Sequence, residues 1–316
     1  MIGILTGPTA TGKTELALTF ARRFPKIEII NADSLLVYRE MNIGTAKPSR
    51  SELDQTPHHL IDVCNPDQIF TAGEFKRAAE ATIAEIQGRG KMPLIVGGTG
   101  FYLKSLLFGL WKAPAADLEL RKKLEENTST ELHQKLSTID SVAAQRIGLK
   151  DRYRLVRALE LHQLTGQTPT ALQAAVPTEP DPRFRLWVID RPLEELYRRI
   201  EVRTRVMLEQ GLIEEYKDLE ARFPNARSLQ AIGYAQVRDH LAGTLPPGRK
   251  IKPGIAGLHE EITLATRQLV KQQRTWFRGL VAKVPESKWF LLEEDQAERR
   301  QAFLEEAVES VYKHLT

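Results

Sequence analysis

Short apolar runs alternate with helical stretches through the first hundred residues. Strands are expected over the apolar runs at residues 2–5, 27–30, 59–63 and 94–96. Helices are expected over residues 15–24 and 75–87, where apolar positions recur with a helical period. Strands that alternate with helices predict βαβ units, so the expected fold class is α/β with a mostly parallel sheet.

After about residue 111 the pattern becomes charged and helical. Helices are expected over residues 118–136, 153–164, 194–222 and 258–279, with a further helix at the C-terminus. Proline- and glycine-rich loops are expected over residues 166–182 and 243–254. Strand-like runs return at residues 186–189 and 289–292. The pattern therefore predicts an α/β core that is interrupted by helical material.

Composition narrows the protein class without identifying a function. Of the 316 residues, 42% are hydrophobic and 27% charged, which is typical of a globular protein and argues against disorder. The single cysteine, Cys64, excludes an internal disulfide framework and a multi-cysteine zinc site, and it fits a reducing compartment. The formal charge of +4 weakly favours a polyanionic partner. Without a long apolar run or a signal-peptide pattern, no membrane contact and a cytoplasmic location are expected.

A phosphate-binding loop, or P-loop, follows the first expected strand and opens the first expected helix. It matches the pattern G-x-x-x-x-G-K-[ST] at Gly7, Pro8, Thr9, Ala10, Thr11, Gly12, Lys13 and Thr14. Such a loop directs backbone N–H groups at an anion, and the helix dipole adds positive potential there. Lys13 would contact terminal phosphate oxygens and Thr14 would bind Mg²⁺. Because the loop accepts any diphosphate, an ATP-dependent small-molecule kinase is the first interpretation.

A carboxylate, Asp33, follows the second expected strand at the sheet edge where open α/β folds bind ligands. It could bind Mg²⁺ or accept a proton. In a third interpretation Asp33 only caps the next turn, and the spacing alone does not favour the functional roles over this structural one.

Basic residues gather on one side of the helix expected near the C-terminal end. Residues 262–280 contain Arg267, Lys271, Arg274 and Arg278 and no acidic residue. At about 100° per residue the four fall within an arc of roughly 60°. A solvated helix face usually mixes charges, so a face of one sign favours contact with phosphates. A second basic cluster lies at Arg146, Lys150, Arg152, Arg154 and Arg157.

Several longer motifs make the chain resemble the tRNA dimethylallyltransferases, and the resemblance extends over essentially the whole sequence. The motifs lie at residues 31–48, 93–102, 154–160, 203–208, 231–234 and 266–278. One departure is Leu36, which stands where many members have Gln. Eukaryotic relatives often carry a C-terminal zinc finger of a type that needs more cysteines, so the chain is similar to the bacterial members.

The resemblance implies transfer of a dimethylallyl group from dimethylallyl diphosphate to N6 of the adenosine next to the anticodon, with Mg²⁺ as cofactor. It implies that Asp33 is the general base, and that Lys13, Thr14 and Arg203 act on the diphosphate. Contacts to tRNA are expected from Asp33, Ser34, Leu35, Leu36, Thr99, Arg154, Arg157, Gly233, Tyr234, Arg267, Lys271, Arg274 and Arg278.

The implied organisation is a P-loop core with a helical insertion that forms a tRNA-binding surface. The core would occupy residues 1–112 and the insertion residues 113–183. The core would return over residues 184–316, with tRNA-binding helices at about 200–280 and a closing strand and helix. A monomer is expected. Two other enzymes stay open beside this interpretation: the kinase, and a transferase that prenylates free adenine nucleotides. A non-catalytic RNA-binding protein would have no use for Lys13 and Thr14.

Overall fold

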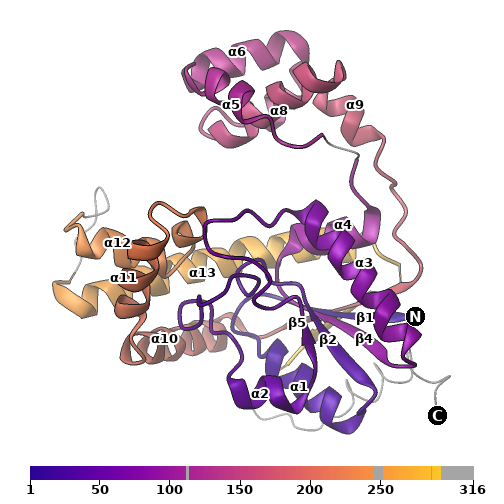
Figure 1. The fold of residues 1–316 in the computed structure, drawn as a ribbon, viewed down its shortest axis with the longest axis vertical. Coiled ribbons are helices and arrows are strands. Elements are labelled where there is room, and N and C mark those ends of the chain that lie inside the picture. The colour runs from indigo at the N-terminus through magenta and orange to yellow at the C-terminus, as the bar shows by residue number, and fades with distance from the viewer. Residues whose placement is uncertain (112–113, 245–251, 286, 293–316) are drawn as a thin grey trace. The chain divides into compact units, whose positions relative to one another are not determined.

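The computed structural model describes residues 1–111, 114–244, 252–285 and 287–292. Within these residues the strands form one parallel sheet of order β3-β2-β4-β1-β5-β6, which confirms the expected fold class (Figure 1). The strands are β1 (Ile2–Thr6), β2 (Ile27–Asn31), β3 (His58–His59), β4 (Met92–Val96), β5 (Phe184–Asp190) and β6 (Lys288–Leu291).

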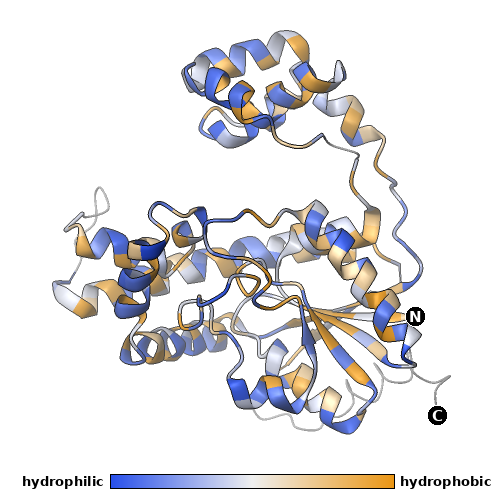
Figure 2. Cartoon of the chain, viewed as in Figure 1, coloured by the Kyte–Doolittle hydropathy of each residue, from blue (hydrophilic) through white to orange (hydrophobic). Residues whose placement is uncertain are grey.

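Helices cover both faces of this sheet, which is why its inner strands are apolar at nearly every position. In β1, β2 and β4 all five residues are buried, and Figure 2 shows these strands as hydrophobic. Helix α1 (Lys13–Arg23) packs Leu16 and Phe20 against Ile29 and Trp187. Helix α3 (Ala72–Gly88) contacts β2 and β4, and a capping box of Thr71 and Glu74 begins it.

The remaining helices are distributed along the chain from residue 50 to residue 281. They are α2 (Arg50–Gln55), α4 (Gly100–Phe108), α5 (Leu118–Glu125), α6 (Ser129–Ile139), α7 (Ser141–Arg146), α8 (Arg152–Thr165), α9 (Pro169–Ala174), α10 (Leu193–Glu209), α11 (Leu212–Arg222), α12 (Tyr234–Leu241) and α13 (Gly254–Val281), with the 3-10 turn Arg227–Gln230. Among the described residues, no helix is both long and apolar enough to cross a membrane.

Four expected elements differ from the structure. The helix expected over 194–222 is two helices, because Gly211 adopts φ 98° between them. The helix expected over 118–136 is also two, since Thr128 caps a new start. The strand expected over 59–63 is only His58–His59, and the loop expected over 166–182 contains α9. The expected C-terminal helix lies outside the described residues.

The chain divides into two compact units. The first comprises residues 1–107 with 181–316, and the second comprises residues 108–180, which overlap the insertion expected over 113–183. The second unit has its own core of buried leucines from α6 and α8, among them Leu132, Leu136 and Leu155. The first unit carries the sheet and every loop at its carboxyl edge.

Candidate active site

The P-loop joins β1 to α1, and its carbonyl groups are held by donors from several elements. The Lys13 ammonium donates to the carbonyls of Gly7 and Pro8, at 2.9 and 2.7 Å. Arg199 of α10 donates to the carbonyl of Ala10 at 2.8 Å, and the buried Arg191, just after β5, donates to that of Thr11 at 2.8 Å. These hydrogen bonds hold the backbone conformation of the P-loop.

Burial changes the acidity of the loop lysine. Desolvation lowers the pKa of the Lys13 ammonium to about 8, although the nearby Asp33 carboxylate opposes the shift. Desolvation also lowers the pKa of the Arg203 guanidinium, again against Asp33. Two partly buried cations beside one carboxylate leave an excess of positive charge, which is what a diphosphate requires.

Sequence reasoning missed three residues that support this loop. Arg191 and Arg199 are two of them, and Gln273 of α13 is the third. The Gln273 amide accepts from the Thr9 N–H at 2.9 Å and donates to the Gly98 carbonyl at 3.3 Å, so it ties the P-loop to the turn after β4. Arg191 follows β5 at the carboxyl edge of the sheet, the same position that drew attention to Asp33, so that signal was present.

Asp33 lies in a turn that the neighbouring side chains fix. Its own N–H donates to Asn31 Oδ1 at 2.8 Å, and its Oδ1 accepts the Leu35 N–H at 2.9 Å. Thr99 Oγ1 accepts the Ser34 N–H at 2.8 Å, so the turn is joined to the loop after β4. Asp33 therefore caps the turn, as one interpretation of the sequence expected, and it does so through Oδ1. Its second carboxylate oxygen, Oδ2, is not needed for this cap.

A single cavity of about 660 Å³ brings the four expected catalytic residues together. Lys13, Thr14, Asp33 and Arg203 all line it. Its apolar wall comes from Ala17, Ile29, Leu36, Ile61, Val96 and Val202. The cavity thus combines a cationic loop, a carboxylate and an apolar surface, and its volume suits a small organic diphosphate.

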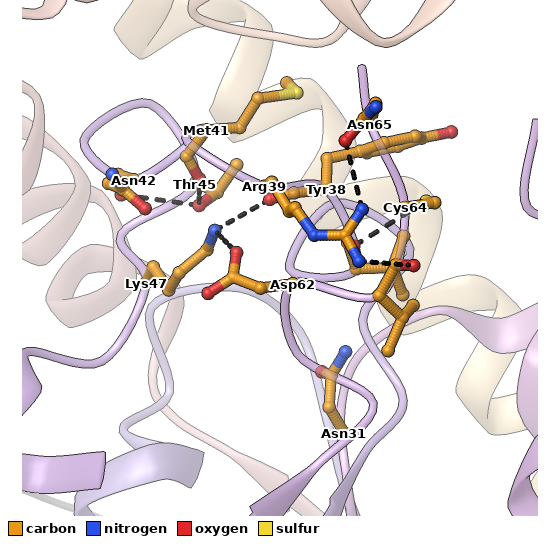
Figure 3. A network of polar contacts seen from close by, with 12 residues as sticks. Asn31, Tyr38, Arg39, Met41, Asn42, Thr45, Lys47, Asp62, Cys64 and Asn65 are labelled. Atoms are coloured by element: carbon orange, nitrogen blue, oxygen red, sulfur yellow. Dashed lines mark hydrogen bonds and ion pairs between the residues drawn. The ribbon is translucent and has the colours of Figure 1, made fainter. Parts of the chain in front are cut away.

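Residues 45–48 line the cavity, and hydrogen bonds from other elements hold the segment of residues 41–48 in place. Figure 3 shows the Lys47 ammonium between the Asp62 carboxylate and the Tyr38 carbonyl, and Lys47 also lines the cavity. Thr45 contributes its carbonyl, which accepts from Arg203 at 3.4 Å. The carboxylate of Glu215, from α11, accepts the N–H groups of residues 42–44.

Tyr234 belongs to the same set of contacts, and the expectation that it contacts tRNA stays a prediction. It is fully buried, and its hydroxyl donates to Glu215 at 2.7 Å. A Cβ on Gly44 would lie 2.4 Å from the tyrosine ring, so only glycine allows this approach. Burial raises the pKa of the Tyr234 hydroxyl, with Glu215 adding to the shift. Gly233, with φ 99°, precedes Tyr234 as the N-cap of α12.

The sequence of α13 predicted an exposed face with only positive charges. In the structure, two of its four basic residues pair with carboxylates from other elements. Arg274 pairs with the buried Asp190 at 2.9 Å, and Arg267 pairs with Glu201 of α10 and lies over the Tyr197 ring at 4.6 Å. The acidic partners come from other elements, so the sequence of the helix does not reveal them. Lys271 and Arg278 are exposed, and these two keep the expected character.

The arginines of α8 also divide into two kinds. Arg157 donates to the buried Glu160 and to the Pro114 carbonyl, inside the second unit. Burial alone would raise the pKa of Glu160, but hydrogen bonds from Arg121 and Arg157 lower it. Arg157 therefore has a structural role in the second unit, and the expectation that it contacts tRNA stays a prediction. Arg154 is exposed and pairs only with Asp151, one turn before it.

The donor set fits Mg²⁺ bound jointly with a diphosphate. The Thr14 side chain and the Asp33 carboxylate line the same cavity, and both offer the oxygen ligands that Mg²⁺ prefers. Among the described residues no group of three or more His, Cys, Asp or Glu side chains could hold a metal ion.

Comparison with known proteins gives a consistent result. The chain is 43% identical over 290 residues to a tRNA dimethylallyltransferase of Chromobacterium violaceum, covering 88% of this chain and 86% of the relative. It is 42% identical over 297 residues to the enzyme of that name from Paraburkholderia phytofirmans, with 90% and 91% covered.

Two solved structures share the fold. A tRNA isopentenylpyrophosphate transferase of Bacillus halodurans superposes with a TM-score of 0.67 at 33% identity, covering 99% of this chain and 98% of the other. A eukaryotic dimethylallyltransferase acting on tRNA gives a TM-score of 0.83 at 23% identity, covering 99% of this chain and 79% of the other. The model of the family described as IPP transferase matches residues 36–280. The chain belongs to the IPP transferase family.

Proposed function

We propose that this protein transfers a dimethylallyl group from dimethylallyl diphosphate to N6 of adenosine 37, next to the anticodon of a tRNA, and releases diphosphate. The observation that carries the proposal is the single cavity lined by Lys13, Thr14, Asp33 and Arg203 beside an apolar wall. Membership of the IPP transferase family and the printed names of the relatives support the same reaction.

The diphosphate is the leaving group, and its developing negative charge must be stabilised. Lys13 and Arg203 supply two cations in a site where burial strengthens electrostatic interactions. The loop amides and the N-terminus of α1 add oriented dipoles. Thr14 would hold Mg²⁺ on the diphosphate, and the ion when bound would neutralise further charge there.

The exocyclic amine of adenine is a weak nucleophile, because its lone pair is delocalised into the ring. As the bond between C1 of the allyl group and oxygen breaks, a bond between C1 and N6 forms, and N6 must lose a proton. Asp33 accepts this proton through the oxygen that does not cap the turn. Leu36 and Ile61, on the apolar wall, are suited to the hydrocarbon part of the donor.

The target adenine must leave its stack to reach the cavity, and phosphate contacts would offset the cost of a few kcal/mol. The exposed basic residues Arg154, Lys271 and Arg278 are the side chains best suited to those contacts. Ser34 and Leu35 lie in the turn of Asp33, and Thr99 bonds that turn from the loop after β4, where the adenine would arrive. The monomeric state and the cytoplasmic location expected from the sequence stay predictions.

The test is mass spectrometry of nucleosides from tRNA incubated with the protein, Mg²⁺ and dimethylallyl diphosphate. We expect adenosine to gain one dimethylallyl group, only in RNA and only with the allylic donor. Modification of free AMP but not of tRNA would favour a transferase of free nucleotides. Consumption of ATP with a small-molecule acceptor would favour a kinase.

A further inference from the structure

The glycine turn at residues 97–100 borders a second hollow as well as the catalytic cavity. Gly97 lines the large cavity, whereas Gly98 and Gly100 line a separate hollow of about 220 Å³. The other lining residues of this hollow are Phe101, Gln272, Gln273, Trp276 and Phe277. The two spaces are therefore neighbours across one turn of the backbone.

Three aromatic rings from two helices line this hollow. Trp276 of α13 lies directly against the backbone of Gly100, where a Cβ would come within 2.6 Å of the indole. Phe277 contacts Trp276 edge to face, with 5.3 Å between ring centroids. The position of the indole is therefore fixed. Phe101 is the second residue of α4, lines the hollow and is 55% exposed.

Polar groups complete the hollow. The Gln273 amide is committed to Thr9 and Gly98, as described above. Gln272 is exposed at the rim, and its amide can both donate to and accept from the edge of a flat heterocycle. On the same helix the exposed Lys271 and Arg278 flank these residues, one just before Gln272 and one two residues after Trp276. Cations beside an aromatic surface suit a ligand that carries both a ring and phosphate.

We propose that this hollow is a stacking site for one unpaired nucleobase of the RNA, the immediate neighbour of the adenosine that is modified. The inference rests on the proposed function, because it requires RNA at the turn of residues 97–100. Pockets for whole small ligands usually measure about 300–1,000 Å³, so 220 Å³ suits one base ring rather than a free nucleotide. Every base has a π-face, so stacking on Phe101 and Trp276 is tolerant of sequence.

The site would act as a positioning device for the reaction. With the target adenine in the cavity and its neighbour held against Phe101, the backbone between them spans the glycine turn. Holding the neighbour would favour the unstacked form of the loop and so recover part of the cost of extruding the adenine. Gln272 would add a contact to the edge of the base.

The experiment is a double-mutant cycle between protein and RNA. Anticodon stem-loop RNAs are made with an abasic residue at the 5′ neighbour of the target, at the 3′ neighbour, or at a distant loop position. Affinities for the wild type and for Phe101→Ala are measured by fluorescence anisotropy at one salt concentration. Stacking on an aromatic side chain is worth about 5- to 150-fold in affinity, and we expect that loss for one neighbour only.

The coupling between the two changes decides the proposal. Phe101→Ala should weaken binding of the unaltered RNA to a similar extent and should cause no further loss with the sensitive abasic RNA. Phe101→Tyr should keep the affinity, because the ring is retained. Leu264→Ala is the matched control on α13, since Leu264 is also exposed but does not line the hollow. Trp276 is not varied, because removing it would leave a gap over Gly100.

Additive losses in the cycle, or unchanged affinity for Phe101→Ala, would overturn the stacking site. A lower melting temperature for Phe101→Ala with unchanged RNA affinity would assign the hollow to packing within the chain. Transfer of the dimethylallyl group to the unaltered RNA is measured alongside. Its absence would count against the proposed function, whereas the binding cycle tests the hollow alone.

Discussion

At the scale of single residues, Lys13 is a cation that the protein itself solvates. Two loop carbonyls accept from its ammonium in place of water, and desolvation still lowers its pKa to about 8. A group with a pKa near 8 changes charge within the range where tRNA enzymes are assayed. The affinity for a diphosphate should therefore depend on pH in a way that an ordinary lysine would not produce.

We expect the dissociation constant of dimethylallyl diphosphate to rise about tenfold between pH 7 and pH 9, because neutral Lys13 loses its attraction for phosphate. Calorimetric titration at the two values checks this. Lys13→Arg is the control, since a guanidinium stays protonated. The folded pKa lies below the value of 10.5 expected in the unfolded chain, so stability should rise as pH increases between about 8 and 10.5. A pH-independent affinity in the wild type would contradict the assignment.

Asp33 has two roles that one substitution separates. Asp33→Asn keeps the oxygen that caps Leu35 but removes the proton acceptor. We expect the single-turnover rate to fall by about 10²–10⁴-fold, with little change in the affinity for dimethylallyl diphosphate. Rapid-quench measurement of prenyl transfer gives the rate. A rate within a few-fold of wild type would leave Asp33 as a turn cap only.

The residues that the sequence predicted well are those whose partners are adjacent in the chain. The P-loop and Asp33 could be found because strand, loop and helix follow one another over a few residues. The pairing of Tyr234 with Glu215 could not be predicted, because the two residues lie on different helices. Glu160 is only three residues after Arg157, but its second partner, Arg121, comes from another helix.

At the scale of elements, α13 connects several parts of the first unit. Its Gln273 holds the P-loop and the turn after β4, and its Arg274 holds the end of β5. A helical pattern in the sequence predicts such a helix and its charged side, but not which charges are used inside the protein. The same limit explains the single helix expected over 194–222, since the pattern continues across Gly211 while the backbone turns there.

Arg274 and Lys271 should therefore behave differently, although both are basic residues of one helix. Asp190 is 1% exposed and Arg274 20%, and breaking such a pair from one side costs on the order of 3–5 kcal/mol. We expect Arg274→Gln to lower the free energy of unfolding by about this amount. Urea denaturation measures it.

The matched variant is Lys271→Gln with Arg278→Gln, which should change the free energy of unfolding by less than about 0.5 kcal/mol per site. Instead it should weaken tRNA binding and reduce the slope of log affinity against log salt by up to about 0.7–0.9 per lost phosphate contact. Equal stability losses in the two variants would show that Arg274 makes no special contribution. An unchanged salt slope would remove Lys271 and Arg278 from the RNA surface.

At the scale of the whole molecule, the second unit is inserted at one point of the first. The Asp181 N–H donates to the Leu107 carbonyl at 2.7 Å, so the chain leaves and returns at adjacent positions. The second unit, residues 108–180, has its own core of buried leucines, and within it Arg121 and Arg157 form ion pairs with the buried Glu160. For the first unit the insertion is therefore equivalent to one long surface loop, and closing a long loop costs little more conformational entropy than closing a short one.

This arrangement predicts that the insertion can be removed without unfolding the sheet. Replacing residues 108–180 by about four Gly and Ser residues bridges the gap easily, since each residue spans up to ~3.3–3.6 Å. We expect the shortened protein to unfold cooperatively and to bind dimethylallyl diphosphate within about threefold of wild type, because the cavity belongs entirely to the first unit. Its affinity for tRNA should fall at least tenfold if Arg154 and its neighbours bind the RNA. Calorimetry and anisotropy on the same preparation measure both, and unchanged tRNA affinity would show that the first unit alone forms the RNA surface.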